Sequence, residues 1–85
     1  MQNSPIGRLL WMAVHNAVFR RYAMTDLGAA LAEAAILLTD REMAELRSFW
    51  ETVIPLSDRS ALEAIQRHAR LHYQPPIEEE ADAHA

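Results

Sequence analysis

The feature that most constrains the fold is a nearly uncharged stretch, residues 25–38, which reads TDLGAALAEAAILL. Ten of its fourteen residues are apolar, and only Asp26 and Glu33 carry charge. A helix that is apolar on nearly every face is buried on most sides. In a chain of 85 residues the other segments must surround such a helix, so we expect it to lie at the centre of the fold.

The segment before this stretch, residues 4–24, has apolar residues at helical spacing and is expected to form the first helix. Ser4 is a typical N-cap, and Pro5 is favoured at the first helical position. Neither Gly nor Pro lies near Met24. The sequence therefore leaves open whether the first helix and the central helix, with Thr25 as its N-cap, are separate or continuous.

An amphipathic third helix is expected after the central one. Thr39 and Glu42 fit a capping box, in which each side chain accepts a hydrogen bond from the backbone of the other residue. Pro55 predicts that the helix ends near Ile54, because the residue before a proline disfavours helical geometry. Trp50 belongs to the apolar stripe of this helix, so we expect it in the core.

A fourth helix is expected from Ser57, its N-cap, to the pair Pro75 and Pro76, which would stop it. Its apolar stripe again covers one face only. Together the four segments predict an all-α fold, a small four-helix bundle built from two antiparallel helical hairpins. The expected helical domain comprises residues 1–74.

The net charge of −4 comes entirely from the end of the chain. Residues 1–73 hold eight Arg and eight Asp or Glu, whereas residues 74–85 hold four acidic residues and no basic one. So polar a segment cannot bury enough apolar surface to order itself, and we expect residues 75–85 to form a disordered acidic tail. The neutral body is not typical of a general nucleic-acid binder, which usually presents a net basic face.

No residue pattern predicts catalysis or a metal site. The chain has no Cys, which excludes a disulfide framework and a thiolate metal site. His68 and His72 share a helix face, but the zinc-protease pattern needs Glu directly after the first His, where this chain has Ala69. His15 is expected to form a buried or interfacial hydrogen-bonded pair with Asn16. We therefore expect no enzyme, no cofactor and no bound metal.

The excess of apolar helical surface is the feature that indicates a function. The first two helices place more apolar residues on more faces than two amphipathic partners can cover. Exposed apolar patches mark interaction sites, and Trp and Tyr are frequent interface anchors. The residues expected to bind another protein, or a second copy of the chain, are Trp11, Phe19, Tyr22, Ala32 and Ile36.

We therefore expect a small helical protein-binding module, an adaptor, inhibitor or regulatory subunit that forms a homodimer. The alternative is a small helical DNA-binding regulator that uses the basic edge of the fourth helix, formed by Arg59, Arg67 and Arg70. The chain contains no run of about 20 apolar residues that would span a membrane. It also shows no secretion-signal pattern, so a cytoplasmic protein of bacterial type is expected.

Overall fold

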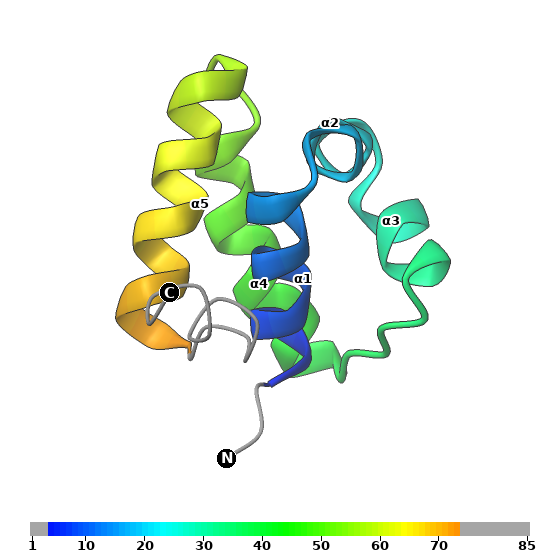
Figure 1. Ribbon diagram of the computed structural model, residues 1–85. Helices are drawn as coiled ribbons and strands as arrows, with labels where there is room; N and C mark the ends of the chain where they lie inside the picture. The colour runs from blue at the N-terminus through cyan, green and yellow to red at the C-terminus, as the bar shows by residue number, and fades with distance from the viewer. Residues whose placement is uncertain (1–3, 74–85) are drawn as a thin grey trace, which may run out of the picture.

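The computed structural model describes residues 4–73, which form five α-helices and no strand (Figure 1). The helices are α1 (Pro5–His15), α2 (Ala17–Thr25), α3 (Leu27–Glu33), α4 (Asp40–Val53) and α5 (Asp58–His72). The all-α prediction is confirmed, but the four-helix bundle is wrong, because the described part of the chain has a fifth helix.

The expected acidic tail, residues 75–85, and the expected helix stop at Pro75 and Pro76 lie outside the described residues. Among the residues that are described, no helix is both long and apolar enough to cross a membrane.

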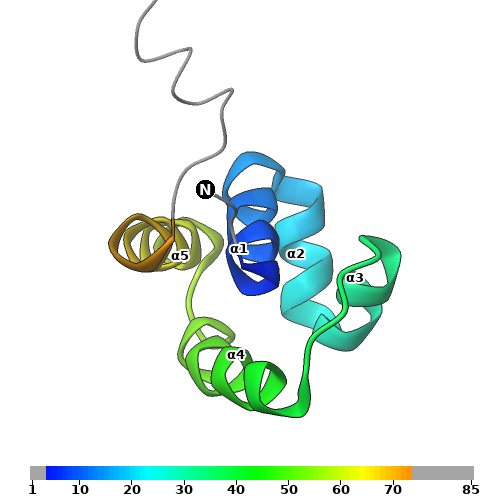
Figure 2. The same ribbon diagram turned by 90° about the horizontal axis from the view of Figure 1, so that it is seen from below.

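Helix α1, and not the apolar stretch at residues 25–38, lies at the centre of the fold. Figure 2 shows α1 between α5 on one side and α2 on the other, with α3 at the periphery beside α2. Leu9, Leu10 and Ala13 of α1 are fully buried. The expectation of a central helix over residues 25–38 is therefore wrong, since only its first half is helical and that half packs mainly against α2.

The apolar stretch stops being helical because α3 ends in a Schellman motif. Ala35 adopts a left-handed conformation with φ of 58°. The Ile36 N–H donates to the Leu31 carbonyl at 2.9 Å, and the Ala35 N–H donates to the Ala32 carbonyl at 3.1 Å. The turn places Ile36 in the core, 3% exposed, and leaves the next residue, Leu37, 89% exposed.

The first expected helix is broken at Asn16, whose backbone is extended with φ of −137° and ψ of 106°. Asn16 ends α1 and caps α2, and Asp26 caps α3 in the same way. In both, the side-chain oxygen accepts from the backbone N–H three residues later, at 3.0 Å. The first helix and the stretch after it are therefore separate, and Asp26 is the N-cap that we expected Thr25 to be.

The predicted starts of α1, α4 and α5 are confirmed. Ser4 and Ser57 are the N-caps of α1 and α5. At the start of α4 the Glu42 N–H donates to Thr39 Oγ1 at 3.1 Å, and the Thr39 N–H donates to Glu42 Oε1 at 2.9 Å, which completes the capping box. Trp50 is 1% exposed, as expected of a core residue.

Gly7 allows α1 and the end of α5 to approach closely. A Cβ atom at this position would lie 3.0–3.1 Å from ring and Cβ atoms of Tyr73. Because such contacts are tighter than most Cβ contacts, Tyr73 would have to shift by a few tenths of an ångström to accommodate a larger residue at position 7. Burial of Tyr73 in this contact is also the main reason why the pKa of its hydroxyl is raised.

Arg20 is the one charged residue that is buried within residues 4–73, at 4% exposed. Its Nε and Nη2 donate to the two carboxylate oxygens of Asp58, each at 3.1 Å. Its Nη1 donates to the carbonyl of Ala13, in the last turn of α1, at 2.8 Å. One guanidinium therefore joins the end of α1, the body of α2 and the first turn of α5, and its hydrogen bonds hold the pKa of Asp58 below the usual value.

We expect Arg20→Met to lower the free energy of unfolding by about 1–3 kcal/mol, because it leaves the buried Ala13 carbonyl without this donor. The matched control is Arg21→Met, at the exposed neighbouring position, which should change stability by less than about 0.5 kcal/mol. Urea unfolding followed by circular dichroism measures both. Equal effects of the two substitutions would contradict the assigned role.

Ala35→Gly should raise the free energy of unfolding by about 0.5–1 kcal/mol, because glycine adopts the left-handed conformation without the steric cost that alanine incurs. Ala32→Gly is the control, at an exposed position of ordinary helical geometry in α3, and should lower stability by a similar amount. The melting temperatures should shift in opposite directions. A shift in the same direction would refute the left-handed turn at position 35.

Candidate functional site

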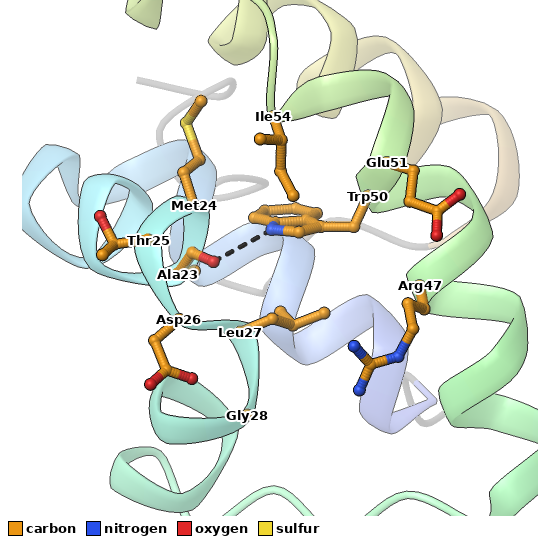
Figure 3. Close-up of a pocket in the computed structure, with 10 residues that line it drawn as sticks. All are labelled: Ala23, Met24, Thr25, Asp26, Leu27, Gly28, Arg47, Trp50, Glu51 and Ile54. Carbon is orange, nitrogen blue, oxygen red and sulfur yellow. Dashed lines mark hydrogen bonds between the residues drawn. The ribbon is translucent and has the colours of Figure 1, made fainter.

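A pocket of about 430 Å³ lies between the α2–α3 junction and the C-terminal half of α4 (Figure 3). This volume falls in the usual range for binding pockets, about 300–1,000 Å³. The residues that line it are Ala23, Met24, Thr25, Asp26, Leu27 and Gly28 from the junction, and Arg47, Trp50, Glu51 and Ile54 from α4 and its C-cap.

The floor of the pocket is the indole ring of Trp50. The Trp50 Nε1–H donates to the carbonyl of Ala23 at 3.0 Å, in a buried hydrogen bond that joins α4 to the last turn of α2. Figure 3 shows Leu27 and Ile54 on either side of the ring. Leu27 is 8% exposed, whereas Ile54 is 50% exposed and borders the opening. Trp50 is only 1% exposed, so it fixes the shape of the pocket, and Ile54 supplies the exposed apolar surface at its edge.

Three charged side chains border the pocket, namely Asp26, Arg47 and Glu51. Asp26 also caps α3. Figure 3 shows the guanidinium of Arg47 extending from α4 toward the side of α3. Arg47 forms no ion pair with any other of residues 4–73, so its charge is available to a ligand or a partner.

Gly28 keeps one wall of the pocket open. A Cβ atom built at this position would meet only Oδ1 of Asp26, at the ordinary van der Waals distance of 3.8 Å. A larger side chain at position 28 therefore has room to stand at the border of the pocket.

The structure does not bring the five predicted interface residues together at one surface. Trp11, Phe19 and Ile36 are core residues, at 3%, 9% and 3% exposed, so the expectation that Ile36 lies on the surface is wrong. Tyr22, at 40% exposed, and Ala32 are at the surface of α2 and α3. The core absorbs the aromatic residues because α2, after the break at Asn16, crosses α1 and packs against it (Figure 1).

Sequence reasoning missed the pocket itself. Leu27 and Trp50 were expected to be buried and are, yet the cavity beside them depends on the angle between α2 and α3. The sequence signal for this junction was Asp26, because Asp is one of the preferred N-cap residues. We predicted Thr25 as the N-cap, one residue before the observed cap Asp26. A helix continuous through this region would have no α2–α3 junction and therefore no pocket there.

The arginines of the alternative, DNA-binding prediction are all exposed on α5. Arg59 Nε lies 3.8 Å from a carboxylate oxygen of Glu63 in the next turn. The guanidinium of Arg70 lies over the ring of Trp11, 6.0 Å from its centroid. The basic edge is therefore interrupted by an acidic side chain, and one of its arginines packs on α1.

The buried form of the expected pair of His15 and Asn16 is wrong, because both residues are exposed, and the interfacial form stays a prediction. The ring of His15 stacks on that of Trp11, with 5.9 Å between centroids. The side chain of Asn16 serves as the cap of α2.

His68 and His72 lie side by side at the end of α5, with 4.5 Å between ring centroids. The ring of His68 also stacks on Phe49 of α4, at 4.0 Å. Within residues 4–73 no group of three or more potential ligands is placed to hold a metal ion. Burial is the main cause that lowers the pKa of His68, and the neighbouring His72 adds to it, while Glu45 on α4 acts in the opposite direction.

Because the pKa of His68 is lower in the folded than in the unfolded chain, its neutral form stabilises the fold. This stabilisation is complete above the ordinary pKa of 6.5 and is lost as the pH falls through the lower folded value. We expect the free energy of unfolding to decrease below pH 6.5, and His68→Phe, which keeps an aromatic ring on Phe49, to reduce that slope. Urea unfolding between pH 7 and pH 5 measures both slopes, and equal slopes would contradict the assignment.

Comparison of the chain with protein-family models, with curated proteins and with solved structures finds no match. A function for this chain therefore has to follow from the site.

Proposed function

We propose that the chain is a small helical protein-binding module, an adaptor, inhibitor or regulatory subunit, that acts as a homodimer through the pocket between α2, α3 and α4. The observation that carries this proposal is the pocket of mixed polar and apolar lining, with Trp50 held at its base and the exposed Ile54 at its edge. Interfaces commonly place an apolar anchor residue of one partner in a pocket of this kind on the other.

The pocket is formed before any partner binds. Trp50 is 1% exposed and is held by its hydrogen bond to Ala23, so its ring does not need to be ordered on association. A pre-organised site avoids the entropic cost of fixing side chains at the moment of binding. Charges of both signs at its border, Arg47 and Glu51 on α4 and Asp26 at the α2–α3 junction, favour a partner in one orientation.

The basic edge of α5 is the second candidate surface, for a DNA-binding regulator. Its three arginines are exposed on one helix, which favours contact with phosphates. Glu63 is paired with Arg59 within the same edge, however, and basic and acidic residues are equal in number over residues 4–73. We therefore place protein binding first.

The test compares Ile54→Asp with a matched control, Leu71→Asp, which changes an apolar residue that is 72% exposed on α5, away from the pocket. We expect Ile54→Asp to weaken partner binding at least about tenfold, because the bound state would bury an unpaired charge. Leu71→Asp should bind as the wild type does.

Binding is measured by quantitative enrichment from cells of the source organism, followed by direct titration of each retained protein with the three purified forms. Circular dichroism establishes that both variants keep their helices. Proteins retained equally by the wild type, Ile54→Asp and Leu71→Asp would contradict the pocket as the binding site.

A further inference from the structure

We propose that the end of α5 is a pH-sensitive latch, in which protonation at the histidine pair His68 and His72 detaches the last turn of α5 from α1 while the rest of the helical core stays folded. The contact that opens is the one between Tyr73 and Gly7. Figure 1 shows the last turn of α5 at the same end of the fold as the start of α1. Residues 74–85 follow Tyr73 directly, so opening would free the point from which they extend.

Tyr73 attaches the last turn of α5 to the fold. The residues between the buried Ala69 and Tyr73 are all exposed, and one of them, Arg70, holds its guanidinium over the ring of Trp11 at 6.0 Å from the centroid. Tyr73 is partly buried, and Gly7 lets it approach α1 so closely that a Cβ atom at position 7 would lie 3.0–3.1 Å from it. A helix end that is exposed over most of its last turn opens locally at a lower cost than the whole fold.

The histidine pair belongs to an aromatic cluster at this helix end. The ring of His68 stacks on Phe49 of α4, with 4.0 Å between centroids and 13° between planes. The ring of His72 lies 4.5 Å from that of His68, and the ring of Tyr73 lies 6.3 Å from each histidine. The four rings of this aromatic cluster therefore join α4 to the end of α5.

A proton on His68 weakens the aromatic cluster for two reasons. The ring is partly buried against Phe49, where a charge loses part of its contact with water. The ring of His72 then becomes a like charge at 4.5 Å whenever it also carries a proton. Histidine side chains change their charge between about pH 5 and pH 8, so both effects arise on mild acidification.

The other charges near His68 do not cancel these effects. Burial, and after it His72, lowers the pKa of His68 although Glu45 on α4 acts in the opposite direction. Arg67 and Arg70 are one and two positions from His68 along α5, and side chains at these spacings do not face each other on a helix. The neutral form of His68 is therefore the one that the closed latch favours.

Tyr73 itself does not titrate in this range. Burial is the main cause that raises the pKa of its hydroxyl from the ordinary value of 10, and Glu45 and Glu42 of α4 add to it. The group at the start of α1 that acts on this pKa, in the opposite direction, is the uncharged hydroxyl of Ser4. Tyr73 therefore responds to the charge of the histidines without changing its own.

On α1, the other helix at this end of α5, the titratable side chains are Arg8 and His15. Both are exposed, and neither is among the groups that shift the pKa of His68. When the latch opens, His68 regains water and its ordinary pKa of 6.5. The closed state is therefore fully favoured above pH 6.5 and is lost as the pH falls through the lower value of the closed state.

Nuclear magnetic resonance of the full chain between pH 7.5 and pH 5.5 tests the proposal. In the closed state the Tyr73 ring gives an Overhauser effect to Gly7, and the Tyr73 N–H, which donates to the Ala69 carbonyl at 2.8 Å, is protected from hydrogen exchange. On acidification we expect the Overhauser effect to weaken and the protection factor to fall at least about threefold. The Trp50 Nε1–H, which donates to the Ala23 carbonyl in the core, should keep its signal and its protection.

Three substitutions identify the histidine that triggers opening. His68→Phe keeps a ring on Phe49 and cannot be protonated, so the latch should stay closed at pH 5.5. His72→Gln, at an exposed position, removes the like charge and should reduce the fall in protection. His15→Gln is the matched control, an exposed histidine on α1 outside the aromatic cluster, and should open as the wild type does. Circular dichroism establishes that each variant is folded, and His72→Gln decides the test if His68→Phe is not.

An Overhauser effect and a protection factor that do not change at pH 5.5 would overturn the proposal, as would equal opening of the wild type and His68→Phe. Simultaneous loss of the Trp50 Nε1–H signal would also overturn it, because the acid transition would then be unfolding of the whole chain. The residues of the latch do not line the pocket, so each of these results leaves the proposed function to its own test with Ile54→Asp.

Discussion

The arrangement of the helices depends on one buried guanidinium. The break at Asn16 ends α1, and the last carbonyls of a helix need donors from outside it. Arg20 supplies one to Ala13, and Asp58 compensates the charge that Arg20 brings into the interior. Because this contact fixes α2 against both α1 and α5, it also sets the position of Ala23, the residue whose carbonyl holds Trp50 at the floor of the pocket.

Features that depend on residues a few positions apart were predictable from the sequence. The capping box of Thr39 and Glu42, the N-caps Ser4 and Ser57, and the all-α class required only local chemistry and apolar spacing. The burial of Trp50 followed from the one-sided stripe of its helix. For such elements the local preference and the tertiary contacts favour the same structure, which is typical of folded proteins.

The two breaks were not predictable, because distant contacts decide them. Asn16 stands in a run of helical spacing, and besides its local cap the break has Arg20 of α2 donating to the Ala13 carbonyl at the end of α1. Ala35 is an alanine, the best helix former, in a conformation that favours glycine. Burial of Ile36 stabilises that turn. The apolar pattern of the sequence alone does not indicate which of several consecutive apolar residues is buried in the core. The pocket was missed for the same reason, since it lies at a helix junction.

The helix breaks that local sequence patterns do not predict also form the surface that we propose for binding. A continuous helix over residues 25–38 would carry Leu37 along the same axis as Leu27 and leave no junction at Asp26. The observed turn at Ala35 instead separates Ile36, which joins the core, from Leu37, which does not. In a chain this small the core cannot bury every apolar residue. The break at Asp26 therefore leaves a pocket at the α2–α3 junction, and the separate turn at Ala35 leaves Leu37 exposed.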